Sequence, residues 1–213
     1  MSHDHDHASP AAYWEARYGE ADRVWSGNPN EALVREAGDL PPGRALDLGA
    51  GEGADAIWLA ARGWRVTAVD ISQVALDRAV RHAEREGVAG RISFERHDLS
   101  RTFPDGPFDL VSAHFLHSNV ELPREVILRT AAAAVAPGGV LLIVGHAGFP
   151  DWEHDHHHDV HFPTPQETLE SLELPEGQWD VLVTETYEKV QARPDGQPSK
   201  RLDNTLKLRR RQP

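Results

Sequence analysis

The sequence predicts an α/β fold in which a mostly parallel, doubly wound sheet carries helices on both faces. Three observations support this prediction. Short apolar segments alternate with helical segments from Arg44 onwards, the segment 44–48 is apolar enough to be buried on both sides, and a glycine-rich turn joins it to a helix. Short apolar strands separated by helices form parallel sheets that are covered on both faces. A chain of 213 residues is long enough for one domain with a substantial core.

The alternation also predicts each element in order. Residues 11–37 carry helical signals with a break at 27–29. Strands are expected near 44–48, 65–69, 91–95, 108–113 and 140–145, and helices near 54–62, 73–86 and 122–136. Ser72 is suited to cap the helix at 73–86, and Gly87 to end it. Segments 179–191 and 204–210 predict two further strands, joined by a turn at 194–196.

The turn after the first strand carries the clearest functional signal. Gly49, Gly51 and Gly53 allow the backbone to approach a ligand closely, and the following helix directs its positive end towards the turn. Asp70 ends the next strand about twenty residues further on, where a carboxylate accepts hydrogen bonds from a ribose. The sequence therefore predicts a site for a nucleoside-containing cofactor.

Two cofactors fit this pattern. Gly49, Gly51 and Ala54 satisfy the loose dinucleotide fingerprint, so an NAD(P)-dependent oxidoreductase is one hypothesis. S-adenosylmethionine is favoured because Asp47 precedes the first glycine by two residues. A carboxylate suits the ammonium and sulfonium of that cofactor and would be misplaced beside a pyrophosphate. The chain also lacks a recognisable Tyr/Lys or Ser/Tyr pair for hydride chemistry.

These residues resemble the class I S-adenosylmethionine-dependent methyltransferases, whose first motif is (D/E)-x-G-x-G-x-G. The segments 94–99, 108–114 and 136–144 resemble three later motifs of that family, so the resemblance covers roughly residues 44–146 in the right order. It implies a Rossmann-like sheet of about seven strands with an antiparallel last strand. It further implies an enzyme that transfers a methyl group by in-line displacement and releases S-adenosylhomocysteine.

The resemblance also implies roles for individual residues. Asp47, Gly49, Ala50, Gly51 and Gly53 would line the methionine moiety, Asp70 would hold the ribose, and Ile71, Asp98 and Leu99 would contact adenine. His114 would lie between the cofactor and the acceptor. The N-terminal segment resembles the cover of tellurite-resistance, thiopurine and halide/thiol methyltransferases, so Arg17 and Trp25 are expected to touch cofactor or substrate. The alternative is an amphipathic helix that packs on the sheet edge.

The acceptor is left open by the sequence. A thiol, halide or chalcogen oxyanion would need no base, and the N-terminal resemblance favours such an acceptor. An O- or N-methyltransferase of a small metabolite would need a general base, for which His114, His117 and His146 are the predicted residues. Each of these histidines has a structural alternative, in which it is packed and hydrogen-bonded to the backbone.

Residues 151–163 contain an unusual run of histidines and carboxylates. Imidazole ligands suit zinc and other divalent metals, and His154, His156, His158 and His161 are the residues predicted for such a site. A solvated acidic loop with adventitious metal affinity is the alternative. A metal-binding protein on a methyltransferase-like fold is therefore a third hypothesis, because the chain has 13 His and no Cys.

Composition limits the partners and the organisation of the chain. A net charge of −12 disfavours nucleic acid as a partner, and no apolar run or signal peptide indicates a membrane, so a cytoplasmic enzyme acting on a small molecule is expected. The sequence gives no oligomeric state. Residues 1–10 are expected to be a disordered His/Asp-rich tail and 11–213 a single domain, with a helical cover at 11–40 and a His-rich loop or lid at 147–175.

Overall fold

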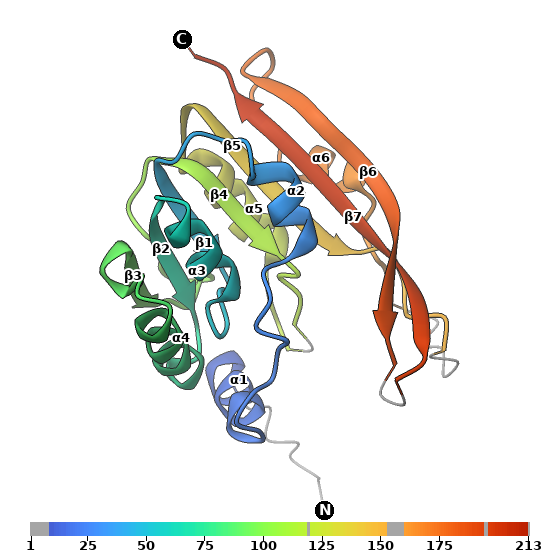
Figure 1. Cartoon of the computed structure of the whole chain (residues 1–213). Coiled ribbons are helices and arrows are strands. Elements are labelled where there is room, and N and C mark those ends of the chain that lie inside the picture. The colour runs from blue at the N-terminus through green and yellow to red at the C-terminus, as the bar shows by residue number, and fades with distance from the viewer. Residues whose placement is uncertain (1–8, 119, 153–159, 194–195, 213) are drawn as a thin grey trace, which may run out of the picture.

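The computed structural model describes residues 9–118, 120–152, 160–193 and 196–212. Seven strands in these ranges form one sheet in the order β3-β2-β1-β4-β5-β7-β6 (Figure 1). They are β1 (Arg44–Leu48), β2 (Arg65–Asp70), β3 (Ile92–Arg96), β4 (Phe108–His114), β5 (Val135–His146), β6 (Trp179–Ala192) and β7 (Pro198–Arg210). Strands β1 to β5 pair in parallel, whereas β7 is antiparallel to both β5 and β6. The predicted fold class is thereby confirmed.

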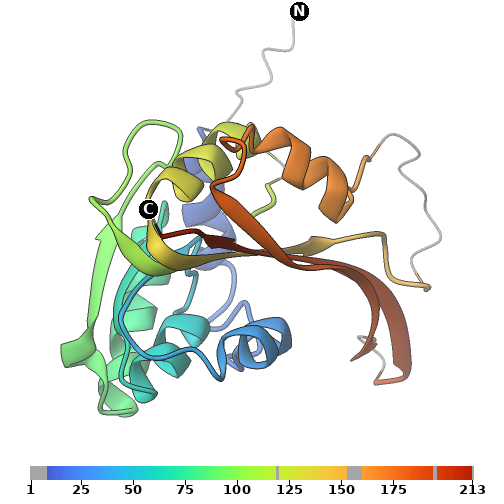
Figure 2. The same ribbon diagram turned by 90° about the horizontal axis from the view of Figure 1, so that it is seen from above.

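Helices cover both faces of the sheet, as Figure 2 shows. On one face lie α2 (Glu31–Ala37), α3 (Ala54–Ala61) and α4 (Gln73–Arg85), and on the other lie α5 (Arg124–Ala133) and α6 (Pro165–Ser171). Helix α1 (Pro10–Gly19) packs against α4 (Figure 1). No helix in the described ranges combines the length and the apolar character that a bilayer span requires.

Alternation along the central strands divides the core into two layers. In β1, Ala45 packs with α2 and α3, whereas Leu46 and Leu48 pack with α5 on the opposite face. Side chains of a strand point alternately to the two faces, so a strand that is apolar at every position is buried on both. Because β1 pairs in parallel with β2 and β4, the carboxyl ends of these three strands lie at one edge of the sheet.

Several boundaries differ from those predicted. The helix predicted at 122–136 spans only Arg124–Ala133, because Pro123 precedes it and the chain then enters β5 at Val135. The strand predicted at 140–145 begins earlier, at Val135, and residues 136–139 belong to β5, where Gly138 has a φ of 81° and the pairing with β4 shifts register. Gly138 therefore lies at an irregularity within a strand and not in a turn that precedes it.

The predicted loop or lid at 147–175 contains a helix that the sequence analysis missed. α6 begins after Thr164, whose side chain accepts from the backbone N–H of Glu167 while the Glu167 carboxylate accepts from the backbone N–H of Thr164. This capping box fixes the first turn of the helix. Its sequence signature, Thr-Pro-Gln-Glu, was present and could have been recognised.

The β6–β7 hairpin reaches beyond the rest of the sheet. β5 ends where His146 pairs with Asp203, but β7 continues to pair with β6 as far as Ala192 and Pro198. Residues 198–202 and their partners 188–192 therefore overhang the carboxyl edge of the parallel strands (Figure 1). This overhang brings side chains from the end of the chain to the same edge as the glycine-rich turn.

Candidate functional site

A cavity of about 560 Å³ lies at the carboxyl edge of the parallel strands. Open α/β sheets bind ligands at this edge, near the point where the strand order reverses. The cavity is bordered by the ends of β1, β2 and β4, by the N-terminal segment and by the hairpin overhang. Ten residues predicted to hold the cofactor line it: Trp25, Asp47, Gly49, Ala50, Gly51, Asp70, Ile71, Asp98, Leu99 and His114.

Two residues predicted for the cofactor do not line the cavity. Gly53 has a φ of 87°, and a Cβ built on it would lie 2.8 Å from Cβ of Ala79. Its role in this structure is therefore to let α3 approach α4. Arg17 projects from α1 into solvent, where its guanidinium pairs with Glu20 at 2.9 Å.

The glycine-rich turn is held closely against the N-terminal segment. Gly51 has a φ of 54°, and a Cβ on it would lie 2.9 Å from the Tyr18 hydroxyl and 3.3 Å from Nε1 of Trp25. That indole N–H donates to the Tyr18 hydroxyl at 2.9 Å. Any side chain at position 51 would therefore push the aromatic cover away from the turn.

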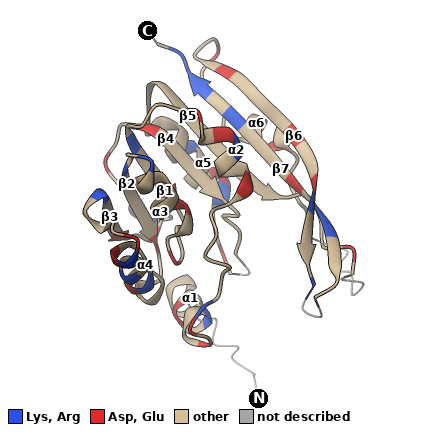
Figure 3. Ribbon diagram, viewed as in Figure 1, with Lys and Arg blue, Asp and Glu red and all other residues tan. Residues whose placement is uncertain are grey.

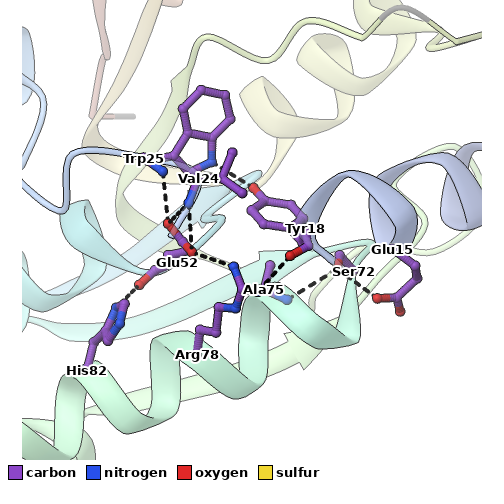
Figure 4. Close-up of polar contacts among 9 residues, drawn as sticks. All are labelled: Glu15, Tyr18, Val24, Trp25, Glu52, Ser72, Ala75, Arg78 and His82. Atoms are coloured by element: carbon purple, nitrogen blue, oxygen red, sulfur yellow. Dashed lines mark hydrogen bonds and ion pairs between the residues drawn. The ribbon is translucent and has the colours of Figure 1, made fainter. Parts of the chain in front are cut away.

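Glu52 connects the turn to the N-terminal segment that carries Tyr18 and Trp25, here called the cover (Figure 4). Its carboxylate accepts from the backbone N–H groups of Val24 and Trp25 and from Arg78 at 2.9 Å. Burial raises the pKa of Glu52, but these hydrogen bonds outweigh it and hold the pKa below its ordinary value. Arg78 also donates to the carbonyl of Tyr18, so one ion pair ties the turn, the cover and α4 together.

A second carboxylate attaches α1 to the start of α4. Glu15 accepts from the Ser72 hydroxyl and from the backbone N–H groups of Gln73 and Val74. An acid at the N-terminus of a helix satisfies its free N–H groups and is stabilised by the helix dipole. Ser72 caps α4 as predicted, since its hydroxyl accepts from the N–H of Ala75 at 3.2 Å.

Three ionisable side chains gather behind the turn. Nδ1 of His114 lies 2.6 Å from Oδ2 of Asp55, and Asp55 also accepts from the backbone and side-chain N–H groups of Asn30. Asp47 is next to them, and its Oδ2 has no hydrogen-bond partner within the described part of the chain. Burial, followed by the charge of Asp55, raises the pKa of Asp47 to about 7.

Asp70 ends β2 at the opposite side of the turn. One carboxylate oxygen accepts from the N–H of Gly51 and the other from the N–H of Ser72, each at 2.9 Å. Burial raises its pKa above the ordinary value. A carboxylate has about four lone-pair sites, so Asp70 can still accept from a hydroxyl group that enters the cavity.

The three histidines that sequence analysis proposed as bases occupy different environments. Nε2 of His117 accepts from the backbone N–H of His146, and burial, followed by repulsion from Arg124, lowers the pKa of His117 to about 4. His117 is therefore neutral at pH 7 with its lone pair engaged. His146 lies at the rim, where its Nδ1 is 3.0 Å from Oδ1 of Asp203 and its ring stacks between Phe115 and His117.

The hairpin overhang adds cations to the same side of the cavity. Lys189 and Arg201 are among the lining residues, and Figure 3 shows basic residues along this part of the hairpin. The guanidinium of Arg201 pairs with Asp203 and lies 5.8 Å from the centre of the Phe115 ring. The cavity is thus acidic at the ends of β1 and β2 and carries imidazoles and cations near β5 and β7.

Sequence analysis missed several residues of this site. Asp55, Glu52 and Asn30 act through long-range contacts, and Lys189 and Arg201 reach the cavity only because the hairpin overhangs the sheet. Only Asp55 had a local signal, since an acid in the first turn of the helix after a glycine-rich turn faces the ligand edge.

The predicted metal site gains no support from the described residues. His154, His156 and His158 lie outside them, and His161 has an exposed side chain 3.4 Å from Glu167. Within the described ranges, no group of three or more His, Cys, Asp or Glu side chains is arranged to hold a metal ion.

Comparison with known proteins finds methyltransferases. Residues 45–139 match a methyltransferase domain family. A 2-heptyl-1-hydroxyquinolin-4(1H)-one methyltransferase from Mycobacteroides abscessus is 30% identical over 164 residues, which are 74% of this chain and 68% of that protein. The ribosomal RNA small subunit methyltransferase C of Chromohalobacter salexigens is 35% identical over 133 residues, which are 59% of this chain and 38% of the relative. The chain thus spans about two fifths of the length of the first curated relatives that it matches.

Solved structures share the fold. TehB from Haemophilus influenzae superposes with a TM-score of 0.67 at 21% identity, over 86% of this chain and 62% of that one. A methyltransferase from Geobacter sulfurreducens, solved in complex with S-adenosyl-L-homocysteine, gives a TM-score of 0.54 at 23% identity, over 81% of this chain and 73% of that one. With the motif order, the strand order and the hydroxyquinolone relative in agreement, the chain belongs to the class I S-adenosylmethionine-dependent methyltransferases.

Proposed function

We propose that this protein transfers a methyl group from S-adenosylmethionine to a small-molecule acceptor. The observation that carries the proposal is the division of the cavity, with buried carboxylates at the ends of β1 and β2 and with imidazoles and cations near the hairpin. A cationic cofactor suits the first half, and an acceptor that is anionic or loses a proton suits the second.

The residues present fit this cofactor. The unpartnered oxygen of Asp47 can accept from an ammonium group, Asp70 can accept from ribose hydroxyls, and Leu99 and Ile71 offer apolar surface to adenine. When bound, S-adenosylmethionine supplies a methyl group that its sulfonium already activates. The protein's contribution is to position the two reactants and to exclude water, for which the N-terminal segment is suited because its Trp14, Tyr18 and Trp25 line the cavity.

A small acceptor fits the enclosure better than RNA does. The cover and the hairpin overhang both border the cavity, and the chain has a net charge of −12, which opposes binding to a phosphate backbone. Lys189 and Arg201 favour a thiolate, a halide or a chalcogen oxyanion. The hydroxyquinolone methyltransferase provides a precedent for a small substrate, whereas other relatives are named as RNA methyltransferases.

If the acceptor is a hydroxyl or an amine, His146 is the residue we propose as its base. Asp203 binds Nδ1 of His146, so its Nε2 is free to take a proton at the cavity rim. His117 is unsuited because its Nε2 already accepts a hydrogen bond. His114 is unsuited because its Nε2 is buried behind the turn.

Calorimetric titration with S-adenosylmethionine and S-adenosylhomocysteine tests the cofactor. We expect one-to-one binding that weakens about 30-fold in Asp70→Asn, since a hydrogen bond to a charged group contributes about 2 kcal/mol. The matched control Asp77→Asn removes a carboxylate on α4 that bonds only to Gln73 within the described contacts, and should bind normally. Formation of S-adenosylhomocysteine from S-adenosylmethionine is then measured with thiols, halides, oxyanions, phenols and a short RNA as candidate acceptors. If neither S-adenosylmethionine nor S-adenosylhomocysteine binds, the proposal is wrong.

A further inference from the structure

Two cations face each other on the overhang of the β6–β7 hairpin. Lys189 on β6 pairs in register with Arg201 on β7, and both residues line the cavity. Directly opposed residues of antiparallel strands project their side chains to the same face, with Cβ atoms about 5 Å apart. Like charges in this arrangement destabilise a sheet. The pair therefore needs an explanation that the stability of the hairpin does not give.

The positive charge of Arg201 is compensated within the protein. Asp203 is buried and accepts from Nε of Arg201 at 2.9 Å through Oδ1 and from Nη2 at 3.3 Å through Oδ2. Oδ1 of Asp203 also lies 3.0 Å from Nδ1 of His146. Both oxygens of this carboxylate are therefore occupied by groups other than Lys189.

The positive charge of Lys189 has no such partner. Its neighbour Glu188 projects to the opposite face of the hairpin, where it pairs with Lys200 at 2.9 Å. The carboxylates that line the cavity form no ion pair with Lys189 in the described part of the chain: Asp47, Glu52, Asp55, Asp70, Asp98 and Glu121. The hairpin side of the cavity therefore carries one positive charge that a ligand or solvent has to balance.

The guanidinium of Arg201 is fixed with one edge free. Asp203 occupies the edge formed by Nε and Nη2, and the centre of the Phe115 ring lies 5.8 Å from Cζ, within the range of a cation–π contact. A guanidinium carries five N–H donors in a planar fork. The edge that contains Nη1 has no hydrogen-bond partner among the described residues, so it can donate to an anion with two oxygens.

Phe115 holds its place beside this guanidinium in a strained conformation. Its φ is 49°, in the left-handed region that an aromatic residue seldom adopts. Its N–H donates to the carbonyl of Val144 at 2.8 Å, and its carbonyl accepts from the N–H of His117 at 2.7 Å. Residues in such conformations are fixed by their surroundings and gather at ligand sites. Because Phe115 lines the cavity and contacts both Arg201 and His146, the strained residue and the cation pair belong to one site.

We propose that the ammonium of Lys189 and the Nη1 edge of Arg201 bind a carboxylate of the acceptor that is not itself methylated. This inference rests on the proposed function, and it narrows the acceptor to a small molecule that carries a nucleophile and a separate carboxylate. An oxygen held by two cations is a weak nucleophile, so the carboxylate orients the acceptor while another atom attacks. One unbalanced positive charge matches a carboxylate, whereas a phosphate monoester carries about 1.5 to 2 negative charges at neutral pH.

Binding of inert probes tests the pair without methyl transfer. The protein saturated with S-adenosylhomocysteine is titrated with phenylacetate and with phenylacetamide, which have nearly the same shape and differ in charge, and NMR gives the dissociation constants. Phe115 and Leu116 offer apolar surface to the phenyl ring of both probes. Because hydrogen bonds to a charged group are stronger than neutral ones, we expect phenylacetate to bind about tenfold more tightly.

Substitutions on the two faces of the hairpin separate a local effect from a general loss of charge. Lys189→Met should bring the two dissociation constants within about twofold of each other, and Lys189→Arg, which keeps the charge, should retain the preference for phenylacetate. The matched control Lys200→Met removes the same charge from the opposite face and should leave the preference unchanged. Thermal unfolding checks that Lys189→Met folds, since loss of one of two opposed like charges should not lower its midpoint.

Methyl transfer tests the same pair during the reaction. The acceptors para-sulfanylphenylacetate and para-sulfanylphenylacetamide carry the same thiol at a distance from the group that differs. We expect kcat/KM to be about tenfold higher for the carboxylate, mainly through a lower KM, because the pair binds a group that does not react. Lys189→Met should remove this difference and leave kcat for the amide unchanged.

The outcomes separate this inference from the proposed function. If S-adenosylhomocysteine binds but phenylacetate has no advantage over phenylacetamide, or if Lys200→Met abolishes the advantage as Lys189→Met does, the carboxylate site is wrong and the proposed function stands. If neither S-adenosylmethionine nor S-adenosylhomocysteine binds, the proposed function is wrong, and the inference that rests on it is wrong as well. The probe titration decides between these cases whether or not either thiol is methylated.

Discussion

Two histidine–aspartate pairs border the cavity, and they differ in their access to solvent. Asp55 holds Nδ1 of His114 with a side-chain exposure of 3% for the histidine, whereas Asp203 holds Nδ1 of His146 with an exposure of 29%. The first pair lies beneath the cover, and the second lies at the rim beside the hairpin overhang. The same two residue types can thus orient a fixed acceptor at one place and a proton-transfer group at another, because burial decides what can reach the free nitrogen.

The largest difference between the pairs should be in catalysis. His146→Gln removes the rim imidazole but keeps a polar side chain, and we expect kcat/KM for a phenol or amine acceptor to fall by about 10²–10⁴-fold. For a thiolate or halide, which carries no proton to remove, the rate should change little. Steady-state kinetics with both acceptor types checks this prediction. His117→Gln is the matched control, and an equal loss there would mean that the stacked rings matter rather than the base.

A smaller difference is expected in stability. His114→Ala deprives the buried Asp55 of a hydrogen-bond partner at 2.6 Å, and removing a partner from a buried carboxylate costs about 3 kcal/mol in the free energy of unfolding. His146→Ala leaves Asp203 paired with Arg201 and should cost about 1 kcal/mol. Urea denaturation of the two variants measures both values. Equal losses would show that the difference in burial has no energetic consequence.

The pH dependence of the free energy of unfolding tests the raised pKa of Asp47, which lies next to the buried pair of Asp55 and His114. Because its pKa in the folded protein is raised from 3.8 to about 7, the folded state binds more protons than the unfolded state between these values. Stability should therefore fall by about 2–3 kcal/mol as the pH rises from about 5 to about 8, and Asp47→Asn should remove this loss. Thermal unfolding at several pH values, without cofactor, gives the difference between the two proteins. A constant difference across this range would contradict the raised pKa.

The smallest effect should come from loosening the cover over the buried pair. Glu52→Gln keeps one acceptor for the N–H groups of Val24 and Trp25 but removes the ion pair with Arg78. We expect the dissociation constant for S-adenosylhomocysteine to rise about tenfold, which corresponds to about 1.4 kcal/mol. Calorimetry measures it, with Glu86→Gln beyond the other end of α4 as the control. An unchanged affinity would mean that the cover is fixed by its aromatic contacts alone.

Most residues that the sequence predicted for the cofactor line one cavity, and their contact with a cofactor stays a prediction. Gly49, Gly51 and Asp70 lie within a short stretch around two strands and one helix, where local geometry fixes their relative positions. Arg17 was predicted beside the cofactor and lies in solvent, because the face that a residue presents on a short helix depends on how the helix docks. The metal residues His154, His156 and His158 fall outside the described chain, so that prediction remains untested at those positions.

The sequence by itself determined the order of the strands along the chain, helices α3, α4 and α5 and the glycine-rich turn, because these depend on contacts within about thirty residues. Only the tertiary structure decided which histidine is buried and which is at the rim. Asp55 meets Asn30 and His114, and Asp203 meets His146, across separations of 25, 59 and 57 residues. The lengths of β6 and β7 beyond β5 bring Lys189 and Arg201 to the cavity. Such contacts arise from sheet register and chain packing, which no local pattern encodes.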